Sequence, residues 1–132
     1  MWFCLNNGFL SVVAPANDLD GEFLLVRARR QGDIERYFPA AKVERRPERD
    51  YLFRALILRE EVAAVIAAEI AGIDYNNFKN SVRDDRLHGA YARVWSTMAA
   101  LQPTPPYSGT RSAAARARRR PAHQLALPKV AE

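Results

Sequence analysis

The chain has 132 residues, which is the length of about one domain. Its single cysteine, Cys4, excludes a disulfide within the chain, and no stretch approaches the ~20 apolar residues that a membrane-spanning helix needs. The formal net charge of +5 comes from the last residues, since residues 1–108 carry 14 Lys and Arg against 14 Asp and Glu. The net charge of the body therefore does not support a nucleic-acid surface there, and we expect a cytoplasmic protein without a membrane anchor.

The apolar start of the chain predicts a β-hairpin. Met1–Leu5 and Phe9–Ala14 are apolar runs, and residues 6–8 (NNG) lie between them. Asn-Gly favours a type I′ turn, in which both central residues need positive φ. We expect Cys4, within the first run, to be buried and unreactive.

Three further strands and a short helix are predicted in the middle of the chain. Alternating side chains indicate strands over Glu22–Arg29 and Tyr51–Leu58. Lys42–Arg46 is a possible edge strand, because its charges suit an unpaired edge. Asp33–Phe38 has helical spacing and is followed by a proline.

Helical spacing of apolar residues then predicts three helices. They are Arg59–Gly72, a helix of roughly Tyr75–Arg83 capped by Asp74, and Asp85–Leu101. We expect the apolar stripes of these helices to face the core, and the positions concerned are Val62, Val65, Ile66, Ile70, Ile73, Tyr75, Phe78, Val82, Leu87, Tyr91, Val94, Trp95, Met98 and Leu101.

This order of elements is typical of an α+β domain. We expect a mostly antiparallel sheet of four or five strands, in which an N-terminal hairpin is followed by two or three strands, with helices packed on one face. The domain should occupy residues 1–105. Residues 106–132 are rich in Ala, Arg and Pro, and we expect a disordered basic tail.

Several short motifs are spread over about residues 1–100. They are MW at 1–2, NGFLSVV at 7–13, VRAR at 26–29, DY at 50–51, RA at 54–55, IDYNNFK at 73–79, Val82, Tyr91 and VW at 94–95. In these the chain resembles a family of small uncharacterised bacterial proteins that share the NGFLSVV start and the IDYxNFKxxV…YxxVW helical region. The resemblance brings no activity with it, so it implies a family and no function.

Three arginines form the first candidate site. Arg27 and Arg29 share a strand face, and Arg54 lies in a strand that could pair with theirs. If the faces coincide, three guanidinium groups could bind one phosphate or carboxylate. The alternative is structural: each arginine pairs with a carboxylate of the fold.

A polar helix forms the second candidate site. Asn77, Lys79 and Asn80 could contact a partner from a short helix. The alternative is an ordinary solvated helix surface, with Asp74 as its cap.

The sequence indicates no catalytic set, no metal site and no cofactor. Asp85 and His88 could share a helix face, but a metal would want a third ligand. Glycine-rich phosphate loops and paired CxxC motifs are absent from the sequence.

Three functions follow, in this order. The first is a small non-catalytic interaction or regulatory protein that binds another macromolecule, most simply a protein. The second is a nucleic-acid-associated protein, and the third is a small enzyme with an anion site at Arg27, Arg29 and Arg54. The nucleic-acid-associated protein would use weak, salt-dependent contacts from the tail arginines Arg116, Arg118, Arg119 and Arg120.

Overall fold

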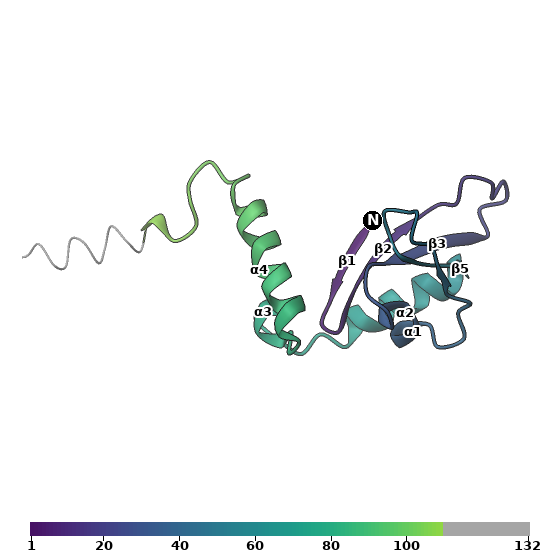
Figure 1. Cartoon of the computed structure of the whole chain (residues 1–132). Helices are drawn as coiled ribbons and strands as arrows, with labels where there is room; N and C mark the ends of the chain where they lie inside the picture. Colours follow the sequence, from purple (N-terminus) through teal and green to yellow (C-terminus); the bar gives the residue numbers. More distant parts are fainter. Residues whose placement is uncertain (110–132) are drawn as a thin grey trace, which may run out of the picture. The chain divides into compact units, whose positions relative to one another are not determined.

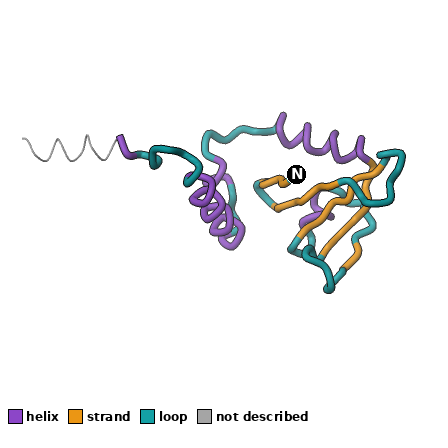
Figure 2. The backbone as a smooth tube through the Cα atoms, turned by 90° about the horizontal axis from the view of Figure 1, so that it is seen from above, coloured by secondary structure: helices purple, strands orange, loops and turns teal. Residues whose placement is uncertain are grey.

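The computed structural model describes residues 1–109, and Figures 1 and 2 show the path of the chain. It divides into two compact units, Met1–Arg93 and the segment from Val94 onward. The strands of the described residues are β1 (Trp2–Leu5), β2 (Gly8–Val13), β3 (Phe23–Ala28), β4 (Glu44–Arg45) and β5 (Phe53–Leu58). Their helices are α1 (Asp33–Tyr37), α2 (Arg59–Ala71), α3 (Phe78–Ser81) and α4 (Asp85–Ala99).

The five strands form one antiparallel sheet. Its order is β1-β2-β3-β5-β4, so β1 and the two-residue β4 are the edges. Strands β3 and β5 pair over six residues, from Phe23 opposite Leu58 to Ala28 opposite Phe53, although α1 and β4 separate them in the chain. The predicted α+β fold with an antiparallel sheet is confirmed.

One face of the sheet, here called the covered face, packs against α1 and α2 (Figure 2). Strand alternation sends every second side chain to this face, and those side chains are apolar. The resulting core consists of Leu10, Val12, Val26, Ala28, Ile34, Phe38, Ala55, Ile57 and Val62.

The other face, here called the open face, carries Ser11, Arg27, Arg54 and the remaining alternate residues of β2, β3 and β5. Near the β1–β2 turn, Phe9 on this side packs against a second cluster formed by α3, α4 and the residues between them. Farther along the face, Leu56 and Leu58 are 58% and 43% exposed, so described helices leave this part of the sheet uncovered.

The N-terminal hairpin is confirmed, but the predicted type of turn is wrong. Leu5 pairs with Gly8, so Asn6 and Asn7 are the central residues, and neither has positive φ. Gly8 lies within β2, where a Cβ would be 3.2 Å from the Cγ of Asp33. Glycine is thus needed for the close approach of α1 and not for the turn.

Two predicted elements are shorter in the structure. β4 comprises Glu44–Arg45 instead of Lys42–Arg46, because Val43 turns toward the core and Lys42 does not pair with β5. α3 begins after Asn77 and not after Asp74, because the Asn77 side chain accepts a hydrogen bond from the Asn80 N–H.

Some predicted core positions are exposed. Cys4 is exposed, because β1 is an edge strand and Cys4 points away from the covered face. Partial desolvation raises the pKa of its thiol, so the protonated form predominates at neutral pH. Ile70 and Ile73 are 64% and 51% exposed, since they line a groove along β1 instead of the core.

Trp95 is also exposed, so its predicted place in the core is wrong. Tyr91 and Leu87, one and two turns earlier, are buried against Phe78 and Val82. Trp95 is 41% exposed and stacks on Tyr107, with 6.4 Å between the ring centroids. Periodicity identified the apolar stripe of α4, but other residues cover this stripe only as far as Tyr91.

Candidate functional site

The three predicted arginines lie together on the open face. Arg27 of β3 is directly opposite Arg54 of β5. The guanidinium carbons of Arg27 and Arg29 lie over the ring of Tyr51, 4.5 Å and 4.3 Å from its centroid. The ring is only 4% exposed, so these guanidinium groups cover an aromatic face with which they interact favourably.

Asp50 is the carboxylate that this cluster shares. Arg54 Nη2 donates to Asp50 Oδ1 at 2.7 Å, and Arg27 Nη1 lies 3.9 Å from Oδ2. Arg29 Nη1 donates to the backbone oxygen of Asp50 at 2.8 Å. These contacts match the structural alternative, in which the arginines are partnered within the fold.

Arg27 has the most enclosed surroundings of the three. Its Nη2 donates to the Oγ of the fully buried Ser11 at 2.8 Å, whereas its Nε is buried without a hydrogen-bond partner. Arg27 and Arg54 face the single carboxylate of Asp50 and Arg29 binds its backbone oxygen, so the cluster keeps a local excess of positive charge.

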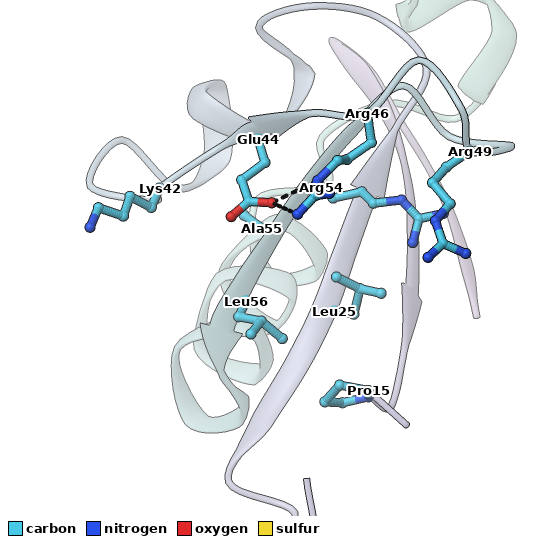
Figure 3. A pocket seen from close by; sticks show the side chains of 9 residues that line it. All are labelled: Pro15, Leu25, Lys42, Glu44, Arg46, Arg49, Arg54, Ala55 and Leu56. Atoms are coloured by element: carbon cyan, nitrogen blue, oxygen red, sulfur yellow. Dashed lines mark hydrogen bonds and ion pairs between the residues drawn. The ribbon is translucent and has the colours of Figure 1, made fainter. Parts of the chain in front are cut away.

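A cavity of about 480 Å³ opens next to this cluster, and Figure 3 shows its lining. Four lining side chains are cationic and one is a carboxylate, although residues 1–108 are neutral overall. The charges of the body are therefore segregated in space. The lining residues are Pro15, Leu25, Lys42, Glu44, Arg46, Arg49, Arg54, Ala55 and Leu56.

Two of these cations are available to a ligand. Arg46 contacts Glu44 at 2.9 Å and Glu48 at 3.6 Å, so it is partnered. The side chains of Lys42 and Arg49 are exposed, and within residues 1–109 they have neither a hydrogen bond nor an ion pair. The cavity thus presents positive charge that the fold leaves uncompensated.

The cavity also has an apolar part. Leu25 and Leu56 are cross-strand neighbours on β3 and β5, and Pro15 lies beside them in the lining. Figure 3 shows the two leucines on the same side of the sheet as Arg54. A ligand that fits this surface therefore needs negative charge together with apolar side chains.

The residues of the second candidate site have structural roles on α3. Asn77 caps the helix, and Asn80 provides the N–H that this cap accepts. Lys79 is half-buried in the same short helix. The arginines of the first candidate site lie on β3, just after β3 and on β5.

A separate ion-pair cluster joins α1 to the start of α4. Arg30 lies 3.0 Å from Asp33 and 3.2 Å from Asp84, and the nearly buried Asp33 also accepts from the Phe9 N–H. A hydrogen bond from the Leu87 N–H lowers the pKa of the Asp84 carboxyl, and the positive charge of Arg30 lowers it further. In the described part of the chain, no three His, Cys, Asp or Glu side chains converge on a possible metal position.

Sequence reasoning missed the residues that organise the site. The sequence does not single out Asp50 or Arg49 as site residues, and it places Tyr51 only at the start of a strand and Lys42 only among the charges of an edge strand. The contact between Asp50 and Arg54 depends on the conformation of the turn before β5, for which the sequence offers no signal. The tail arginines predicted to contact nucleic acid lie outside the described residues.

None of the helices in residues 1–109 has the length and apolar character needed to cross a membrane. Comparison with protein-family models, curated proteins and solved structures finds no significant match, so the family resemblance stays a prediction.

Proposed function

We propose that this protein is a non-catalytic interaction module that binds an acidic segment of another protein on its open face. The observation that carries the proposal is the lining of the cavity, where Lys42 and Arg49 have no ion pair within residues 1–109. Complementary charge accelerates association and selects partners, while the neighbouring leucines supply apolar surface to bury.

A protein partner fits this surface better than a nucleic acid does. Proteins that bind single strands stack bases on exposed aromatic rings, and among residues 1–109 none of those that line the cavity is aromatic. The nearest ring of the arginine cluster, Tyr51, is buried under guanidinium groups. Nucleic-acid binding remains the second candidate, supported by the arginines of the tail.

The enzyme hypothesis has weaker support. An anion clamp needs guanidinium N–H groups that are free to bind substrate, but Arg27 and Arg54 already contact Ser11 and Asp50. The free positive charge lies instead at Lys42 and Arg49, on the rim of an open cavity.

The proposal can be tested with a fluorescent peptide, Glu-Glu-Val-Thr-Val-Glu-Glu, whose binding to the full chain is followed by fluorescence anisotropy. The double variant Lys42→Glu/Arg49→Glu should weaken binding by roughly tenfold or more, because attraction becomes repulsion. Arg36→Glu is the matched control: Arg36 is equally exposed but lies on α1, which packs on the covered face. It should change the affinity by less than about twofold.

Two controls identify other outcomes. The basic tail also attracts acidic peptides, so a variant with Arg118, Arg119 and Arg120 changed to Ala is measured in parallel. Binding that depends on these arginines and ignores Lys42→Glu/Arg49→Glu would contradict the proposal. Tighter binding of a single-stranded oligouridine, lost in the cavity variant, would favour the nucleic-acid alternative.

A further inference from the structure

We infer that the acidic segment binds as an additional β-strand along the outer edge of β5, an inference that rests on the proposed function. The observation behind this inference is that β4 covers only part of this edge. Glu44 and Arg45 pair with Arg54 and Phe53, and the pairing ends there.

The chain leaves the edge just before β4. In a continued antiparallel register, Lys42 would lie opposite Leu56, but no such pair exists. Figure 3 shows Lys42 pointing away from β5. The position that a longer β4 would occupy beside Leu56 is therefore left open within the described part of the structure, and the cavity lies there.

The backbone N–H and C=O groups of Leu56 point toward this open position. Arg59 N–H donates to the oxygen of Glu22, just before β3 begins, so the backbone N–H and C=O groups of odd-numbered residues of β5 face β3. The backbone groups of even-numbered residues face outward. Leu52, just before β5, shows this, because its oxygen accepts a hydrogen bond from the Arg46 N–H at 2.7 Å. Exposed outward groups of this kind are the template on which extended peptides add to a sheet.

The side chains around the open edge define the incoming segment. Apolar residues at its centre would lie beside Leu56 and Leu25, in the exposed apolar part of the cavity. Carboxylates at its ends would reach Lys42, Arg49 and Arg46. The occupant is therefore an extended segment of another protein, with a short apolar centre and acidic flanks.

The opposite edge of the sheet has the wrong chemistry for this ligand. The outward groups of β1 belong to Trp2 and Cys4, because Met1 exchanges hydrogen bonds with Val12. The groove along β1 has a volume of about 220 Å³, and of the described residues that line it only Glu69 is charged. A strand could add there by geometry, but an acidic strand would meet a carboxylate, so charge selects β5.

Amide hydrogen exchange, measured by NMR on the full chain with and without the peptide Glu-Glu-Val-Thr-Val-Glu-Glu, tests the inference. At saturation, exchange at the Leu56 N–H should slow by roughly tenfold or more, because a new hydrogen bond must open before exchange. The Cys4 N–H on β1 is the internal control and should not change. Slowing at Cys4 instead of Leu56 would overturn the inference.

A second peptide separates this inference from the proposed function. It has the same sequence, but its central Val-Thr-Val is N-methylated, which removes the strand's donors and keeps its charge. If strand addition is correct, this peptide should bind roughly tenfold more weakly, because the donor to the Leu56 oxygen is lost and an N-methyl group points at the strand edge in its place. Equal binding, still weakened by Lys42→Glu/Arg49→Glu, would overturn strand addition and leave the proposed function standing.

Two remaining outcomes overturn the inference in different ways. If neither peptide binds, the proposed function falls and strand addition falls with it. If the Leu56 N–H becomes protected without peptide as the protein concentration rises, the edge is occupied by a second copy of this chain. Light scattering on the same samples would then show a dimer.

Discussion

At the scale of single residues, Asp50 holds the arginine cluster together. It is the one carboxylate in contact with both Arg27 and Arg54, and its backbone oxygen binds Arg29. Its side chain is 60% exposed, so solvent screens part of this interaction. The residue acts chiefly by neutralising charge that would otherwise be repulsive.

Asp50→Asn should therefore lower the free energy of unfolding by about 1–2 kcal/mol, mostly through repulsion among the arginines. The loss should shrink as sodium chloride is added, because salt screens that repulsion. Urea unfolding at low and high salt measures both effects. Glu48→Gln, which removes an exposed carboxylate 3.6 Å from Arg46, is the control and should have little effect. A loss that is independent of salt would contradict the argument.

Gly8 is the second residue whose identity follows from packing. Gly8→Ala places a Cβ 3.2 Å from Asp33 and from Tyr37, and Asp33 is held by Arg30 and the Phe9 N–H. We expect a destabilisation of about 1–3 kcal/mol, which is typical of overpacking.

Gly89→Ala is the matched control for this prediction. Gly89 lies within α4, where the nearest atom to an added Cβ is Arg93 Nη1 at 3.8 Å. This change should stabilise the protein by about 0.5–1 kcal/mol, because alanine favours helix. Thermal unfolding of both variants measures the contrast. If Gly8→Ala were as stable as Gly89→Ala, the contact with α1 would be looser than the distances indicate.

At the scale of elements, Tyr91 connects α4 to the N-terminal hairpin. Its hydroxyl lies 2.8 Å from the oxygen of Gly8 and 3.0 Å from that of Leu5. One hydroxyl hydrogen serves these two acceptors, and the ring packs in the cluster of Val82 and Leu87. The start of α4 is therefore tied to the sheet by a polar contact as well as by apolar packing.

Tyr91→Phe should lower stability by about 1–2 kcal/mol, because the carbonyl groups of Leu5 and Gly8 lose the hydroxyl as a donor. Tyr75→Phe is the control, since the Tyr75 hydroxyl has no hydrogen bond within residues 1–109. Urea unfolding at neutral pH measures the difference. A Tyr91→Phe protein as stable as the control would mean that the hydroxyl does not hold α4 to the hairpin.

The pH dependence of Tyr91 provides a further test. Burial raises the pKa of Tyr91 above its ordinary value, so the folded state favours the neutral phenol. The contribution of the Tyr91 phenol to the free energy of unfolding is fully present below the unfolded-state pKa of about 10, and it is lost as the pH rises above that value. Burial also raises the pKa of Tyr37, so wild type and Tyr91→Phe should both weaken in alkali. The free energy of unfolding of wild type should fall more than that of Tyr91→Phe. Equal falls of the two proteins from pH 9 to 11 would contradict this prediction.

At the scale of the whole molecule, the residues of both buried clusters lie within the unit Met1–Arg93. Deleting residues 108–132 should therefore change the melting temperature by no more than a few degrees, because no residue of either cluster is removed. Differential scanning calorimetry of the full and shortened chains measures this. A larger fall would show that residues after 107 contribute to the stability of the body.

The strands were predictable from the sequence because their pattern is local. Side chains alternate with a period of two, so Phe23–Ala28 and Phe53–Leu58 could be recognised, and Arg27 and Arg29 could be assigned to one face. That Arg54 lies opposite Arg27 could not be predicted, because this depends on the register of strands more than 20 residues apart.

The sequence by itself determined the type and order of the elements, since backbone preference and alternation act between neighbouring residues. Only the tertiary structure decided which apolar stripes are covered, as Trp95 and Ile70 show, because covering needs a second element that the stripe does not specify. It also decided that β4 begins only at Glu44, which leaves Leu56 exposed beside Lys42. The neutral composition of residues 1–108 conceals this cationic cavity, because composition sums charges that the fold separates in space.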